Sequence, residues 1–183
     1  MRKTGSNLSS GLIPYSVAIG ALIVVSLAAG EAGAETKTDT IGPWQIEATF
    51  TGEKFNRCSI ARKLDDDIVA TFVRTSDGLT LELASPNWKL ERGKLYPVKL
   101  ALGPVSLDEQ VAAESGSVSL DVNDKKFAAG LRSASALNVV AAGATIRVPL
   151  DKSTAAFDRL EQCVAKNERA VETNPFVAPA RQP

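Results

Sequence analysis

The sequence predicts a mainly β domain: an antiparallel β-sandwich or partly open barrel, with one C-terminal α-helix packed against it and one disulfide. Three observations predict this class. About eight short stretches with strand-like patterns recur at fairly regular spacing, and turn residues separate them. A single strong helical pattern follows them near the end of the chain.

The strands are predicted from alternation and from β-branched residues. From Trp44 onward, apolar and polar residues alternate cleanly, which is typical of a strand with one buried face. In the next strand Cys58 shares the inward face with Ile60, and Asp77 and Gly78 then favour a hairpin turn. We predict strands over 44–51, 55–62, 68–74, 79–83, 95–102, 118–122, 137–140 and 145–150.

Other segments are less regular. Pro97 favours an edge or strand-end position for its strand, because proline cannot donate a ladder hydrogen bond. The pattern over 105–114 fits a strand or a short helix, and 125–131 fits a short helix. After Pro149, an apolar stripe at helical spacing predicts a helix that covers the sheet, with Asp151 or Ser153 as its cap. Its stripe consists of Ala156, Leu160 and Val164, with Cys163 beside it.

The first part of the chain is predicted to be a cleavable secretory signal, residues 1–34. Arg2 and Lys3 precede a largely apolar run, and the small residues 32–34 fit the site that signal peptidase accepts. The alternative is an uncleaved membrane anchor, because the run is about as long as the shortest spanning helix. After cleavage we expect no integral membrane span. The mature chain then divides into a polar lead-in at 35–42, a single β-rich domain at 43–166 and a disordered tail at 167–183.

The two cysteines are expected to pair. Cysteines of an exported chain are usually bridged, and Cys58 lies in an early strand while Cys163 lies in the late helix. Such a bridge would close a loop of about 105 residues and restrict the unfolded chain by about 4–5 kcal/mol. Two free, buried thiols are the alternative.

Composition limits the possible functions. Lys and Arg number 21, as do Asp and Glu, so the chain carries almost no net charge and lacks the basic stripe that nucleic acids require. The chain has no histidine, which is the commonest general base and transition-metal ligand. We therefore expect no nucleic-acid partner, no cofactor, no metal site and no nucleophilic catalysis.

Aromatic and basic side chains are the candidate binding residues. The aromatic candidates are able to stack on a sugar or on a partner, although core or sheet-cover positions are the alternative. The basic candidates would form a patch for an anionic glycan or a lipid headgroup, although exposed strand faces commonly carry such charges. The aromatic candidates are Trp44, Trp88 and Tyr96, and the basic candidates are Arg57, Arg62 and Lys63.

Acidic residues form two local groups. Asp65, Asp66 and Asp67 are consecutive, whereas a calcium loop places its oxygen ligands at alternate positions and includes a glycine. We expect these aspartates to be solvated, and the same holds for Asp121 and Asp124. A carboxylate pair defined by distance in the fold is still compatible with a glycosidase.

An ordered set of features resembles a known family. Trp44 opens the first predicted strand, an inward Cys58 follows, and a helix that contains Phe157 and Cys163 closes the domain. In this order the chain resembles small exported alphaproteobacterial proteins, among them the invasion-associated locus B family. The resemblance implies a periplasmic or envelope-associated protein without known catalysis.

We thus expect a non-catalytic, periplasmic or secreted protein of a Gram-negative bacterium that binds a protein or a cell-envelope component. The first alternative is a periplasmic glycan hydrolase that works through carboxylates. A hydrolase inhibitor is the other alternative, since small disulfide-closed β domains also serve in that role.

Overall fold

The computed structural model describes residues 34–75 and 77–172. Within this part of the chain, the strands form two antiparallel sheets and neither sheet closes into a barrel. The six-stranded sheet has the order β1-β2-β3-β4-β5-β8, and the four-stranded sheet has the order β10-β9-β6-β7. The predicted class, a mainly β fold with a C-terminal helix and one disulfide, is confirmed.

The elements follow one another with short connections. The six-stranded sheet contains β1 (Ala34–Ile41), β2 (Trp44–Thr51), β3 (Lys54–Lys63), β4 (Val69–Thr75), β5 (Gly78–Ala84) and β8 (Ser117–Asp121). The four-stranded sheet contains β6 (Leu95–Leu102), β7 (Val105–Ala112), β9 (Ala136–Ala141) and β10 (Ala144–Pro149). The helices are η1 (Asp65–Asp67), α1 (Lys125–Ser133) and α2 (Ser153–Glu172). Over the described residues, neither α1 nor α2 has the length and apolarity needed to cross a membrane.

One face of the six-stranded sheet carries most of the core, and we call it the inner face. Strand register places five buried residues side by side across it, because directly paired residues point to the same side. These residues are Ile46, Ile60, Phe72, Leu81 and Leu120. The alternation that predicted β2 arises from this burial.

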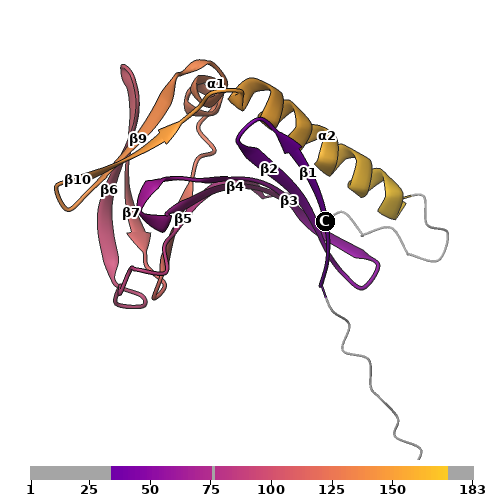
Figure 1. The fold of residues 1–183 in the computed structure, drawn as a ribbon, viewed down its shortest axis with the longest axis horizontal. Coiled ribbons are helices and arrows are strands. Elements are labelled where there is room, and N and C mark those ends of the chain that lie inside the picture. The colour runs from indigo at the N-terminus through magenta and orange to yellow at the C-terminus, as the bar shows by residue number, and fades with distance from the viewer. Residues whose placement is uncertain (1–33, 76, 173–183) are drawn as a thin grey trace, which may run out of the picture. The chain divides into compact units, whose positions relative to one another are not determined.

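The inner face is covered by two different elements. Figure 1 shows α2 lying along β1, β2 and β3, while the four-stranded sheet lies at the other end, beyond β5. The helix buries its predicted stripe, with Ala156 and Leu160 fully buried and Val164 nearly so. The four-stranded sheet contributes alternate residues of β6, of which Val98, Leu100 and Leu102 are buried.

The disulfide joins the helix to the sheet. Cys58 in β3 and Cys163 in α2 are bridged, with Cα atoms 6.2 Å apart, so the predicted pairing is confirmed. At the start of α2, the indole Nε1 of Trp44 donates a hydrogen bond of 2.8 Å to the carbonyl oxygen of Asp151. The helix is therefore held at both its start and its middle.

Three features differ from the prediction. The polar lead-in at 35–42, for which no strand was predicted, contains most of β1, which pairs with β2 along its whole length. The predicted tail at 167–183 begins inside α2, which continues to Glu172. The stretch that fitted a strand or a helix is β7. Residues 1–33 and 173–183, on which the rest of the signal and tail predictions fall, lie outside the described residues.

Two local details refine the prediction. Pro97 lies in an inner strand, not at an edge, but it precedes by one residue the segment of β6 that pairs with β9. Proline is tolerated there because that ladder begins only at Val98. The carboxylate of Asp124 accepts a hydrogen bond of 2.8 Å from the backbone N–H of Phe127 and so caps α1.

Candidate functional site

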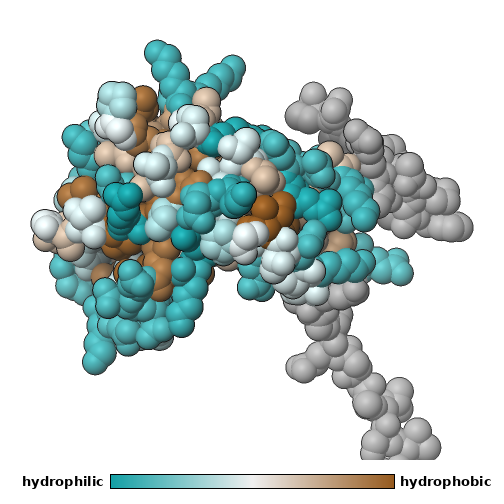
Figure 2. All heavy atoms as spheres, turned by 45° about the horizontal axis from the view of Figure 1, so that its top comes forward, coloured by the Kyte–Doolittle hydropathy of each residue, from teal (hydrophilic) through white to brown (hydrophobic). Residues whose placement is uncertain are grey.

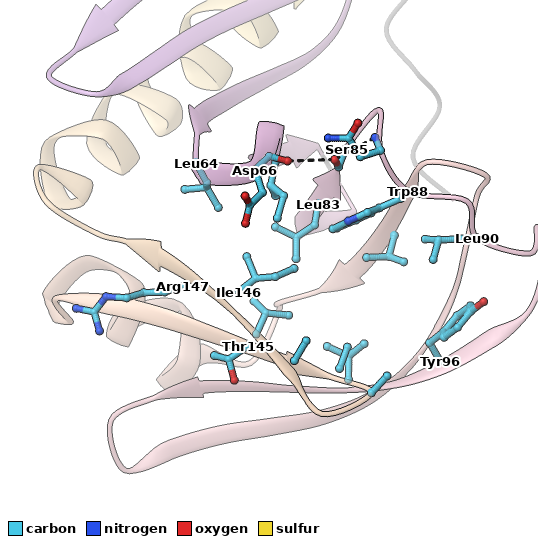
Figure 3. Close-up of a pocket in the computed structure, with 18 of the residues that line it drawn as sticks. Leu64, Asp66, Leu83, Ser85, Trp88, Leu90, Tyr96, Thr145, Ile146 and Arg147 are labelled. Carbon is cyan, nitrogen blue, oxygen red and sulfur yellow. Dashed lines mark hydrogen bonds between the residues drawn. The ribbon is translucent and has the colours of Figure 1, made fainter.

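A pocket lies between the two sheets. Its volume is about 650 Å³, within the range of small-molecule sites. One wall comes from the six-stranded sheet and η1, including Leu64, Leu83 and Val118. The opposite wall comes from β6, β9 and β10, including Val139 and Ile146. Figure 3 shows Leu83 and Ile146 approaching each other across the middle of this space.

The pocket is unfilled because small side chains line it at the end of the β9–β10 hairpin. The β9–β10 hairpin ends in Ala141, Ala142, Gly143 and Ala144, and its three alanines line the pocket. Two packed sheets normally interdigitate through larger inward residues. Figure 2 shows hydrophobic residues gathered among hydrophilic ones in the half that contains β9 and β10. The hairpin end therefore leaves apolar surface facing an unfilled volume.

The interior of the pocket offers few polar groups. Ser85 is only 3% exposed. Its hydroxyl donates to the carbonyl oxygen of Asp66 at 3.5 Å and accepts from the backbone N–H of Asn87 at 3.3 Å. Among the described residues, no buried side-chain nitrogen or oxygen lacks a hydrogen-bond partner. The mainly apolar lining is thus suited to an apolar group, because its buried side-chain polar atoms already have hydrogen-bond partners.

The charged residues of the pocket are exposed and lie at its edge. They are Asp65 and Asp66 from η1 and Arg147 from β10. Figure 3 shows the Arg147 side chain directed away from the centre of the pocket. The edge therefore carries two carboxylates and one guanidinium.

Backbone strain also gathers at the pocket. Of the non-glycine residues described, Asp66, Asp67, Ala142 and Lys152 have positive φ angles. Asp66 and Ala142 line the pocket, and Asp67 follows Asp66 directly. Ala142 has φ of +48°, a left-handed conformation that an alanine adopts at a cost of about 1 kcal/mol or more. Strain of this kind is common at binding sites.

The structure separates the predicted aromatic candidates. Trp88, in the loop after β5, and Tyr96, in β6, both line the pocket and are half-buried. Figure 3 shows both at one end of the pocket. Trp44 is wrong as a binding residue, because it is fully buried in the core against Phe72. Trp44 is therefore a core residue, which was the alternative to a binding role.

The predicted basic patch is wrong. Side chains alternate along β3, so Arg62 lies on the inner face while Arg57 and Lys63 lie on the opposite face, about 20 Å apart. The guanidinium of Arg62 binds the carboxylate of Asp151 and donates to the carbonyl oxygen of Pro149 at 2.9 Å. Lys63 pairs with the carboxylate of Asp67 at 2.9 Å. Arg62 and Lys63 therefore serve different local contacts.

The two carboxyl groups whose pKa is lowered, those of Asp39 and Asp151, lie outside the pocket. The hydrogen bond from Arg62 lowers the pKa of Asp151. The backbone N–H of Thr40, followed by Arg159, lowers the pKa of Asp39. Both shifts favour the ionised form, as expected for structural ion pairs. Over residues 34–75 and 77–172, no three His, Cys, Asp or Glu side chains gather as a possible metal site.

Sequence reasoning found two pocket residues and missed most of the others. Apolar wall residues such as Leu83 and Ile146 look like any other core residue in the sequence. The available signal is the run of small residues at 141–144, which lies between two predicted strands and by itself indicates only a turn.

Comparison with protein-family models, with curated proteins and with solved structures finds no match to this chain. The resemblance to the invasion-associated locus B family therefore stays a prediction.

Proposed function

We propose that this chain is a non-catalytic protein of the cell envelope that binds the alkyl chain of an envelope lipid between its two sheets. The observation that carries the proposal is the pocket of about 650 Å³, whose lining is mainly apolar and whose buried side-chain polar atoms already have hydrogen-bond partners. A partly polar molecule would bind with its chain inside and its headgroup at the edge.

An apolar occupant follows from the physics of packing. Protein interiors contain few voids larger than a water molecule. The pocket is partly open, so water can enter it, but the mainly apolar lining gives that water few polar partners. An alkyl chain would restore the missing dispersion contacts of residues such as Leu83 and Ile146.

The charges at the edge favour one kind of headgroup. Asp65 and Asp66 give two negative charges, against one positive charge from Arg147. A free fatty-acid carboxylate meets net repulsion there, whereas a neutral glycerol headgroup does not. The preference is small, because exposed charges are screened by water and salt.

The proposed cellular location rests on the disulfide and on the predicted secretory signal. A disulfide is typical of an oxidising compartment, and the predicted signal at 1–34 would deliver the chain to it. We propose a periplasmic or secreted location in a Gram-negative host. Mass spectrometry of protein from the native host should find a chain that begins at or near Glu35. Recovery of the Met1 form from the membrane fraction would contradict cleavage.

Tryptophan fluorescence tests binding directly. The chain has two tryptophans, Trp88 in the pocket wall and Trp44 in the core. A monoacylglycerol with bromine atoms on its chain should quench Trp88 saturably, because bromine quenches an indole on contact. The control Trp88→Phe retains Trp44 alone and should show no saturable quenching.

A filling variant tests the location. Ala141→Leu places a larger side chain in the pocket and should weaken binding at least tenfold without unfolding the protein. Leu95→Ala is the matched control, because Leu95 is 61% exposed and does not line the pocket. Unquenched Trp88 at saturating lipid would overturn the proposal. Turnover of a glycan that disappears in Asp65→Asn or Asp66→Asn would instead support the glycan hydrolase.

A further inference from the structure

A second hollow, more open to solvent than the pocket, adjoins one of its walls. Its volume is about 400 Å³, and its lining includes Lys89, Ser115 and Gly116. Trp88 and Leu90 line both this hollow and the inter-sheet pocket, as does Ser85. The two spaces therefore share a wall built from the loop that follows β5.

The backbone of this wall is held in place. The backbone N–H of Trp88 donates to the carbonyl oxygen of Ser85 at 3.2 Å, and that of Leu90 donates to Ser115 at 3.0 Å. Further along, the N–H of Gly93 donates to Ala113 at 2.7 Å. Backbone hydrogen bonds hold this loop to the segment between β7 and β8. A substitution of Trp88 should therefore change the side chain in the wall without moving the backbone of the loop.

The indole of Trp88 lies in the shared wall. Figure 3 shows it on the side of the pocket away from Leu64 and Arg147, with Leu90 and Tyr96 further out on the same side. Its ring nitrogen has no hydrogen-bond partner within 34–75 and 77–172, so a substitution leaves no described polar group unpaired. The ring therefore contributes volume to the wall, and no hydrogen bond to another described residue.

We propose that Trp88 sets the length of the alkyl chain that the pocket accepts. This inference rests on the proposed function. With the indole in place, a chain ends against the shared wall, and longer chains must leave methylene groups in water. Without the ring, the chain can continue into the second hollow. Each further buried methylene is worth about 0.8 kcal/mol, or about a fourfold increase in affinity.

The test is a length profile. Binding of a series of monoacylglycerols of increasing chain length is measured by calorimetry for the wild type, Trp88→Ala and Trp88→Leu. The wild-type affinity should reach a maximum at one length and fall beyond it. Both variants should move the maximum to longer chains, Trp88→Ala further than Trp88→Leu. Leu95→Ala should keep the wild-type profile, because Leu95 lies outside both spaces.

The outcomes separate the two proposals. If the wild type binds no chain of any length, the proposed function fails. If it binds with a length maximum that stays unchanged in a folded Trp88→Ala, the pocket binds lipid but Trp88 does not set the length. If Trp88→Ala does not fold, the profile of Trp88→Leu decides in the same way.

Discussion

The two halves of the inner face are covered in different ways. Over β2, β3 and β4, α2 packs closely, and Trp44, Phe72 and Phe157 form a continuous aromatic cluster. Ring centroids are 6.1 Å apart between Trp44 and Phe72, and 5.1 Å between Phe72 and Phe157. Over β5 and β8, the four-stranded sheet leaves a cavity of about 650 Å³. The half under α2 is closely packed and carries the disulfide, whereas the half under the four-stranded sheet contains the pocket.

This difference indicates a division of roles. Buried aromatic area and a covalent bridge stabilise the helix-covered half. In the other half, Ile146, Val118 and Tyr96 keep part of their surface exposed because the opposing sheet does not fill the space. We expect substitutions in the first half to affect stability, and substitutions in the second half to affect binding.

The largest effect is expected from the disulfide. Cys58→Ser opens a loop with a sequence separation of 105 residues, so the free energy of unfolding should fall by about 4–5 kcal/mol. Urea unfolding followed by circular dichroism measures this change. Reductant should destabilise the wild type but not the double variant Cys58→Ser, Cys163→Ser. An unchanged unfolding midpoint in Cys58→Ser would contradict the role given to the bridge.

Paired truncations compare the two halves directly. Phe72→Ala removes a fully buried ring and should cost about 3–5 kcal/mol. Ile146→Ala removes a half-buried side chain that already faces a cavity and should cost less than about 2 kcal/mol. Both losses are measured by urea unfolding under the same conditions. Equal losses would mean that the pocket wall is packed as tightly as the aromatic cluster.

A smaller effect is expected at the tip of the β9–β10 hairpin. Ala142 and Gly143 form a two-residue turn in which both φ angles are positive, a geometry that favours Asn followed by Gly. Ala142→Asn should therefore raise the free energy of unfolding by less than about 1 kcal/mol. Thermal unfolding should show a small increase in Tm. Ala144→Asn is the control and should bring no gain, because Ala144 lies within β10 and asparagine is disfavoured in strands.

The predictable part of the fold is the part with a strong hydrophobic pattern. Trp44 to Thr51 alternates because one side of β2 is buried, and Cys58 could be placed inward for the same reason. By contrast, β1 was missed because its side chains from 36 to 40 are exposed. It is held by backbone pairing at a sheet edge, which leaves no alternation in the sequence.

The candidate site was harder to predict, because a cavity forms where the opposing side chains are too small to fill the space between two elements. Sequence patterns indicate that a residue is apolar, but they do not show whether an opposing residue fills the space beside it. Trp44 and Trp88 look equivalent as candidates for stacking, yet one is in the core and the other is in the pocket wall. Only the pairing of distant segments separates them.

The smallest effect tests the ion pair at the start of α2. The hydrogen bond from Arg62 lowers the pKa of Asp151 below its ordinary value of 3.8. Because the pKa is lower in the folded chain than in the unfolded chain, the unfolded chain takes up the proton first as the pH falls. The stability contributed by the pair is therefore present above about pH 4 and is lost as the pH falls through the lowered value.

Asp151→Asn should remove this contribution. The variant should be slightly less stable than the wild type at neutral pH, and the two should converge as the pH falls below about 4. The change should be small, because the Asp151 side chain is 58% exposed and an exposed charge is screened. Urea midpoints measured between neutral and acidic pH, at low and high salt, give both dependences. A gap that persists unchanged into acid would show that Asp151 stabilises α2 through some contact other than its charge, such as packing at the turn before the helix.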